Sequence, residues 1–175
     1  EAWYFRGDVE NDCDCQLELA HMVAFGLVRH IDPKKAMDIA KKAFENGSTA
    51  AAFTLGKWYE TWEPVKSIPD SVYCYRKGAE LKEPRCLEEL ARHYMSGTYV
   101  KENPEKAFGL YTQLSEDRED GDIGHAELGR FYEEGIFVKK DTRKARMHYM
   151  EAIRNRNPLA AYRLHEMAER SGYTD

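Results

Sequence analysis

The chain has 175 residues, of which 33% are charged and 42% hydrophobic, a balance typical of a globular protein rather than a disordered one. No stretch approaches the roughly 20 apolar residues that a membrane-spanning helix needs. The net charge of −5 argues against a dedicated nucleic-acid binder, because phosphate binding depends on a dominant basic surface. From Val138 onward, however, nine Lys and Arg outnumber five Asp and Glu.

A leucine recurs along the whole chain at nearly constant spacing. The steps between successive leucines are 36, 35, 38 and 36 residues, the period of stacked helical hairpins. The leucines are Leu19, Leu55, Leu90, Leu128 and Leu164. A small residue precedes each leucine by four positions, which lets neighbouring helices approach closely. These small residues are Cys15, Ala51, Cys86, Gly124 and Ala160.

The period predicts an all-α chain of short hairpins, each stabilised by burying an apolar stripe against its neighbours. We expect four repeats and a capping helix, over residues 12–47, 48–82, 83–120, 121–156 and 157–175. In the first repeat, Leu19 lies on a helix that ends near Gly26. In the second, the loop from Trp62 to Pro69 has a Trp and two prolines, so an unusual backbone is expected there.

The later repeats carry clearer helix boundaries. Leu128, Tyr132 and Gly135 share one helical stripe, and Asp141 is a plausible N-cap for the helix that follows. Before them, the acidic stretch 116–122 lies in a connection about two residues longer than its counterparts, which we interpret as a solvated insertion. A last helix from Pro158 to about Ser171, capped by Gly172, is expected to have a polar outer face.

The recurring residues of the repeats follow one pattern, which is best preserved between Leu128 and Tyr149. Its members there are Leu128, Gly135, Val138, Asp141, Lys144, Ala145 and Tyr149. The pattern resembles the Sel1-like repeat family, which is related to the tetratricopeptide repeats. The resemblance implies a right-handed α-solenoid that serves as a protein–protein interaction scaffold, usually without enzymatic activity. In the family's register Trp3-Tyr4 lies in a second helix. Residues 1–11 are therefore expected to end a preceding repeat, in a chain that starts partway through a longer polypeptide or after a leader.

The cysteines show no regular pairing between repeats. Cys15, Cys74 and Cys86 are interpreted as small core residues, although a Cys74–Cys86 disulfide remains open. The compartment also remains open, cytoplasmic or periplasmic if the source is bacterial.

First helices of stacked hairpins line the concave side, so residues two positions after each leucine form a column there. Lys57, Arg92 and Arg130 would make a basic ridge in this column, able to meet carboxylates of a partner. The alternative is that Arg92 and Arg130 pair with the glutamates three residues earlier; Lys57 has no carboxylate at that offset. The candidate partner-binding residues are His21, Phe53, Lys57, Trp58, Trp62, Glu88, Arg92 and Arg130.

Bulky side chains on the first helices are a second candidate surface, because an aromatic and basic groove can supply binding hot spots. The alternative is that Trp58 and its counterparts three residues after each leucine belong to the core. Apolar pairs also follow the loop glycines, and we expect them to pack onto the next hairpin or to form an exposed edge. They are Leu27-Val28, Thr98-Tyr99 and Ile136-Phe137, with Trp62 in the matching place.

No pattern in the sequence indicates chemistry. The six histidines lack metal-site spacing, and Asp12-Cys13-Asp14-Cys15 lacks a second ligand pair. There is no nucleophile elbow and no phosphate-binding glycine loop. We therefore expect no catalytic residue, metal or cofactor.

The function expected from these observations is a non-catalytic adaptor that binds a protein or peptide in its groove. One version is an inhibitor or immunity protein whose acidic insertion meets a basic toxic enzyme. Another is a subunit of a secretion, envelope or signalling assembly. The alternative from a different class is an enzyme or small-ligand binder that uses the groove.

Overall fold

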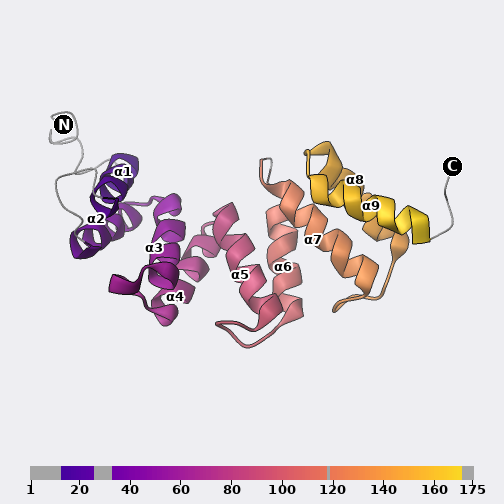
Figure 1. Ribbon diagram of the computed structural model, residues 1–175, viewed down its shortest axis with the longest axis horizontal. Coiled ribbons are helices and arrows are strands. Elements are labelled where there is room, and N and C mark those ends of the chain that lie inside the picture. The colour runs from indigo at the N-terminus through magenta and orange to yellow at the C-terminus, as the bar shows by residue number, and fades with distance from the viewer. Residues whose placement is uncertain (1–12, 26–32, 118, 171–175) are drawn as a thin grey trace. The chain divides into compact units, whose positions relative to one another are not determined.

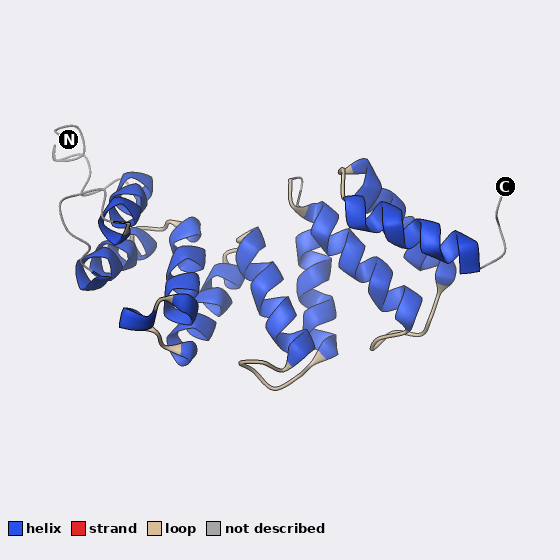
Figure 2. Ribbon diagram, viewed as in Figure 1, coloured by secondary structure: helices blue, strands red, loops and turns tan. Residues whose placement is uncertain are grey.

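The computed structural model describes residues 13–25, 33–117 and 119–170, and within these ranges it contains helices and loops but no strand (Figures 1 and 2). The helices are α1 (Cys13–Ala24), α2 (Pro33–Glu45), α3 (Thr49–Thr61), η2 (Glu63–Val65, a 3-10 helix), α4 (Ile68–Glu80), α5 (Pro84–Ser96), α6 (Pro104–Ser115), α7 (Gly121–Glu134), α8 (Thr142–Arg154) and α9 (Pro158–Arg170). None of these helices has the length and apolar character needed to cross a bilayer. The chain forms two compact units, Glu1–Cys86 and Leu87–Asp175.

The first unit contains two helical hairpins. Helix α1 packs on α2, α3 packs on α4, and α2 also contacts α3. The repeat leucine of α3, Leu55, is 1% exposed, and the small residue Ala51 is fully buried. Leu19 of α1 is only partly buried and packs at the edge of the same core.

The second unit continues this arrangement through α6, α7, α8 and α9, each in contact with the next. Leu90 and Leu128 are buried, as predicted, and so is the small residue Ala160. Gly124 lies against the backbone of Ser115 and Tyr111 on α6, where a methyl group would collide. Small residues ahead of the leucines therefore do set close helix contacts.

A tyrosine on the second helix closes two of the hairpins. Tyr75 donates a hydrogen bond to Glu60 (2.8 Å), and Tyr149 donates one to Glu133 (2.7 Å). In each case the ring lies against a glycine of the first helix, Gly56 or Gly129. The equivalent positions of the third hairpin hold Ala91 and Met95 opposite Tyr111, so that hairpin has no such carboxylate.

Two predicted helix boundaries are confirmed. The Asp141 carboxylate accepts hydrogen bonds from the backbone N–H groups of Arg143 and Lys144, both at 3.0 Å. Gly135 ends α7 with a φ of 77°, a left-handed conformation that glycine adopts without strain.

The two irregular connections also differ from the others. The Trp62–Pro69 loop contains the short helix η2. After it, the backbone N–H of Ser67 donates a hydrogen bond to the carbonyl oxygen of Tyr59 at 2.8 Å. Helix α6 ends at Ser115 and α7 begins only at Gly121. The acidic side chains of this connection are exposed or half-buried, in keeping with a solvated stretch, and two of them also accept hydrogen bonds. Asp117 accepts the N–H groups of two following residues, and Asp122 accepts from Asn157.

Other expectations need correction. Cys74 and Cys86 are buried thiols, so the disulfide between them does not form, whereas Cys15 is only half-buried. Burial raises the pKa of the Cys74 thiol to about 12, which keeps it protonated and unreactive. The outer side of α9 is less polar than predicted, because it exposes Leu159 and Tyr162.

Two loop aromatics make ring contacts with helices that precede them in the chain. Tyr99 contacts His93 of its own hairpin at 4.9 Å between ring centroids, and Phe137 contacts Phe108 of the preceding hairpin at 5.9 Å. Both pack backward along the chain, although Phe137 stays 56% exposed. The expectations for Trp3-Tyr4, Leu27-Val28 and Gly172 lie outside the described residues.

Candidate functional site

An aromatic cleft lies at the ends of α1 and α3 in the first unit. Trp58 contacts the ring of His21 at 5.7 Å and that of Trp62 at 5.4 Å, both edge to face. Beside these rings is a cleft of about 320 Å³ lined by Ala24, Phe25, Trp58, Thr61 and Trp62. Trp58 itself is 9% exposed and acts as the cleft's fixed wall, whereas Phe25 is 69% exposed.

The cleft is positioned by contacts between first helices of successive repeats. His21 lies in the last turn of α1, and its Nε2 is 3.4 Å from Thr54 Oγ1 on α3. The start of η2 immediately after Trp62 turns the chain away from the helix axis. The unusual loop therefore fixes where the Trp62 ring lies.

Phe53, also on α3, lies between two cations. The Arg85 guanidinium is 4.5 Å from its ring centroid and the Lys57 ammonium is 6.0 Å from it, distances at which a cation and a ring attract. Lys57 also pairs with Glu60 at 3.5 Å. Lys57 has no carboxylate three residues before it, as the sequence shows, but Glu60 three residues after it supplies a local partner. Lys57 therefore does not differ from Arg92 and Arg130 in having an intrahelical ion pair.

Charged residues of α5 and α7 gather in the second unit. Arg92 pairs with Glu89, and Arg130 pairs with Glu127 at 2.6 Å. These are the intrahelical pairs that the sequence offered as the alternative to a free ridge, and such pairs contribute only about 0.2–0.5 kcal/mol each. The Arg92 side chain remains 55% exposed, so it is still accessible to a partner.

Glu88, next to these pairs, is half-buried. Burial raises the pKa of its carboxyl above the ordinary value, while Arg92 acts in the opposite direction. A partly desolvated carboxylate gains more from a new cationic partner than an exposed one does. Glu88 and Arg92 thus offer both signs of charge on one helix face.

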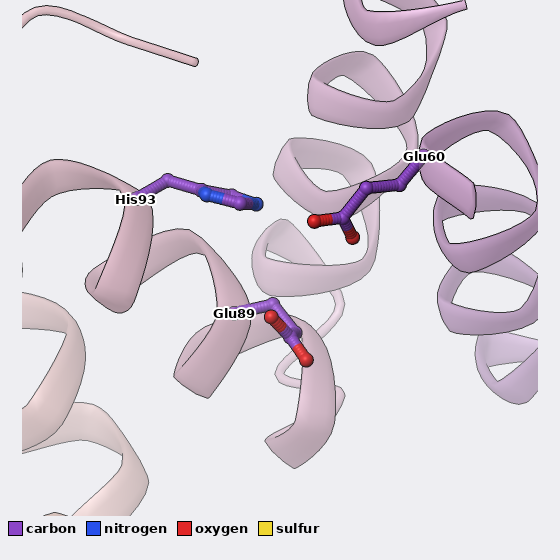
Figure 3. A group of neighbouring side chains, drawn as sticks. All are labelled: Glu60, Glu89 and His93. Atoms are coloured by element: carbon purple, nitrogen blue, oxygen red, sulfur yellow. The ribbon is translucent and has the colours of Figure 1, made fainter. Parts of the chain in front are cut away.

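Two further α5 side chains resemble metal ligands. Glu89 and His93 are one turn apart, and Figure 3 shows both on the same side of α5, with ligand atoms within 4.8 Å of each other. Two ligands from one helix fall short of the four that a structural zinc site uses, and Glu89 already pairs with Arg92. Glu60, also drawn there, is engaged by Tyr75 and Lys57 in the first unit.

The predicted residues are thus distributed over both units. His21, Phe53, Lys57, Trp58 and Trp62 belong to the first, whereas Glu88, Arg92 and Arg130 belong to the second. The basic ridge that joins Lys57 to the two arginines stays a prediction. Among the bulky residues three positions after the leucines, Trp58, His93 and Phe131 lie in the core, at 9%, 5% and 0% exposure.

The family model for the Sel1 repeat matches residues 13–48, 84–117 and 123–157, which together cover more than half of the chain. The chain belongs to the Sel1 repeat family. The segment between the first two matches, 49–83, contains the Trp62–Pro69 loop, where this chain departs from the repeat pattern. No curated protein matches the chain.

Solved Sel1 repeat structures have the same fold. A Sel1 repeat protein from Oxalobacter formigenes is 28% identical with a TM-score of 0.84, over 98% of this chain and 69% of that one. The protective antigen c5321 of uropathogenic Escherichia coli, with an SLR fold, is 27% identical with a TM-score of 0.85, over 96% of this chain and 36% of that one. This chain therefore spans about a third of the antigen's length. Sel1 repeats form all-α solenoids and generally serve as protein-interaction scaffolds.

Two features of this Sel1 repeat chain were not singled out from the sequence. His125 on α7 and His148 on α8 have their Nδ1 atoms 3.1 Å apart, a contact hidden by their separation of 23 residues. Cations from the loop before α8 and from its first turn line another cleft. The positive local charge after Val138 was the signal for that cleft, but its cations come from the end of the loop and the first turn of α8 rather than from one column of first helices.

Proposed function

We propose that this chain is a non-catalytic adaptor that binds a protein partner through the first-helix surfaces of its repeats. The observation that carries the proposal is the aromatic cleft beside Trp58, Trp62 and Phe25. Aromatic side chains around a recess that can receive a partner's apolar side chain are typical of binding hot spots. The charged groups nearby, Lys57 with Glu60, would add specificity rather than most of the affinity.

The surface of α5 and α7 is the second part of the proposal. Glu88, Arg92 and Arg130 would contact the same partner if the first helices of all repeats line one groove, as the Sel1 resemblance implies. The intrahelical pair of Arg92 does not prevent this, because its side chain is 55% exposed even though Glu89 is buried. Arg130 is 31% exposed in its pair and would contact the partner while keeping Glu127.

A narrower role as an inhibitor of a basic enzyme finds less support. Asp117 and Asp122 of the acidic stretch are used in hydrogen bonds within the unit, which leaves Glu116 and Glu119 as its exposed carboxylates. We therefore do not extend the proposal to an immunity protein. A place in a secretion, envelope or signalling assembly is compatible with an adaptor but has no residue-level support of its own.

Site-specific photo-crosslinking in the source cell tests the proposal. A photo-reactive phenylalanine analogue at position 25 should capture one partner protein, and Trp62→Ala should strongly reduce that capture by removing a wall of the cleft. The matched control is the same analogue at Tyr73, an α4 position that is 56% exposed. Equal capture from positions 25 and 73, or no protein captured at position 25, would overturn the proposal.

A further inference from the structure

A second cleft, of about 700 Å³, lies in the second unit where the loop after α7 meets the start of α8. Its lining includes four cationic residues, Lys139, Lys140, Arg143 and Lys144, which we call the basic cleft residues. All four are exposed. The floor is the ring of Tyr132, with the Lys144 ammonium 5.1 Å from its centroid.

The basic cleft residues lack the intrahelical ion pairs that several other arginines of the chain make. Arg92, Arg130 and Arg154 each pair with a glutamate three residues earlier. Within the described part of the chain, no carboxylate oxygen lies within 4.0 Å of a basic cleft nitrogen. The one acidic residue in the lining, Asp141, already accepts two backbone N–H groups as the α8 cap. The lining therefore keeps a net positive charge, with four cations against one carboxylate.

The preceding hairpin provides an internal comparison, because both ends of its loop match those of the later loop. Gly97 and Gly135 have φ angles of 67° and 77°. In both loops a Cβ added to the glycine would lie 3.3 Å from the Cβ five residues later. The residue at the N-cap donates its N–H to the repeat tyrosine's carbonyl in both, at 2.8 and 2.9 Å. A lysine lies over that tyrosine's ring in both, at 5.3 and 5.1 Å.

The two loops differ in backbone at their tips, where Phe137 has a φ of 59° and Tyr99 has no positive φ. At their matching ends they differ in charge. Glu102 stands where the later loop has Lys140, and Glu105 stands where it has Arg143. Lysine occupies both outer positions in each loop, as Lys101 and Lys106 or as Lys139 and Lys144. The earlier loop is thus close to neutral. The positive charge is not required by the matching loop ends, because the earlier loop forms the same glycine and N-cap contacts with glutamates at two of its four charged positions.

We propose that the basic cleft residues bind an acidic peptide segment of a partner protein. Several cations spread along an open cleft fit a row of carboxylates better than one small anion, and such groups attract each other strongly enough to direct association. A nucleic acid or an anionic membrane fits less well, because each requires a wide basic surface and the chain as a whole carries a charge of −5. This site is separate from the aromatic cleft and does not depend on the proposed function of that cleft.

Fluorescence anisotropy with a labelled peptide of alternating glutamate and glycine tests the assignment. The purified chain should bind this peptide, with affinity falling as salt rises, and should not bind the glutamine version. The double variant Lys140→Glu/Arg143→Glu should weaken binding about tenfold or more, which corresponds to ~1.4 kcal/mol. It should remain folded, because the earlier loop already carries these two glutamates.

The control for total charge is Lys42→Glu/Arg76→Glu, which makes the same net change on exposed positions of α2 and α4 and should retain most of the binding. The reverse change, Glu102→Lys/Glu105→Arg, should create a second binding site and raise the stoichiometry. Equal loss in both double variants, wild-type binding by Lys140→Glu/Arg143→Glu, or tighter binding of anionic vesicles or single-stranded RNA would overturn the inference. Trp62→Ala should leave peptide binding unchanged, so failure here and failure of the adaptor proposal are distinguishable.

Discussion

At the scale of single residues, two helical glycines differ in the space around them: Gly129 is buried and Gly109 is exposed. A Cβ at Gly129 would lie 2.5 Å from Cε1 of Tyr149, whose ring is fixed by its hydrogen bond to Glu133. A Cβ at Gly109, on α6, would meet nothing within 4 Å. The same substitution should therefore change stability in opposite directions at the two positions.

We expect Gly129→Ala to lower the free energy of unfolding by about 1–3 kcal/mol, because the added methyl overpacks a buried contact. Gly109→Ala should raise it by about 0.5–1 kcal/mol through helix propensity alone. Urea denaturation followed by circular dichroism measures both. A stabilising effect at position 129 would mean that the Tyr149 ring is not held against this glycine.

The sequence predicts some residue roles well and others poorly. The burial of Leu55, Leu90 and Leu128 follows from the repeat period, because only one helix face can meet the neighbours. The comparison of each cation with the residue three positions before it does not predict the pairing of Lys57 with Glu60, because Glu60 lies three positions after Lys57. The charge of the α7–α8 loop was visible as a regional excess, but its convergence on one cleft depends on the loop's three-dimensional path.

At the scale of the helical hairpin, α7 and α8 are joined by a histidine pair. Besides the 3.1 Å contact between His125 and His148, the His148 ring stacks on Tyr132 with 7° between the planes. Burial lowers the pKa of both imidazoles below the ordinary 6.5, and for His148 the neighbouring His125 and Lys144 lower it further, while Glu151 raises both. The hairpin therefore favours the neutral pair.

Acidification should destabilise this hairpin. Because the unfolded chain takes up protons near pH 6.5 and the folded hairpin does so only at lower pH, stability falls as the pH drops below about 6.5. His125→Gln/His148→Gln should reduce this dependence in urea denaturation at a series of pH values. His165→Gln, on the exposed side of α9, should behave as wild type. Parallel curves for the double variant and wild type would contradict the assignment.

Helices could be predicted more fully than the connections between them. Asp141 and Gly135 mark their helix boundaries by local chemistry, which needs no tertiary contact. Tyr99 and Phe137 face competing apolar surfaces before and after them in the chain, and packing alone decides which one they cover. In the connection after Trp62, Pro64 lies within η2 and Pro69 in the first turn of α4, so the prolines mark an irregular loop but do not define its path.

At the scale of the whole molecule, the chain divides into two compact units whose helices contact mainly their sequence neighbours. In repeat proteins of this kind, stability is roughly a sum of repeat and interface contributions. Damage in one repeat should therefore reach the adjacent helices first. The residues of the candidate site are also divided between the two units, with Lys57 in the first and Arg92 and Arg130 in the second. The column of three cations that the sequence predicts therefore stays a prediction.

Leu128→Ala should lower the free energy of unfolding by about 2–5 kcal/mol, because the side chain is only 2% exposed. Hydrogen exchange should show the largest loss of protection in α6 to α9 and a smaller change in α1 to α3. Leu159→Ala, at a position 55% exposed, is the control and should change stability by less than about 0.5 kcal/mol. Uniform loss of protection would indicate one cooperative unit instead.

The tyrosine–glutamate hydrogen bonds have a consequence for folding as well as for stability. Repeats of similar sequence can pair a second helix with the wrong first helix, and such exchanges are a common route to misfolding and domain swapping. If α6 took the place of α8 on α7, Tyr111 would meet the carboxylate of Glu133 and Tyr149 would take the position opposite Met95 that Tyr111 has in the native hairpin. One tyrosine–glutamate hydrogen bond would be lost and one would form, so this exchange costs nothing at these positions. The tyrosine–glutamate pair is therefore interchangeable between hairpins, and the native pairing is favoured instead by the short loop that joins each first helix to its own second helix, such as the one between α7 and α8.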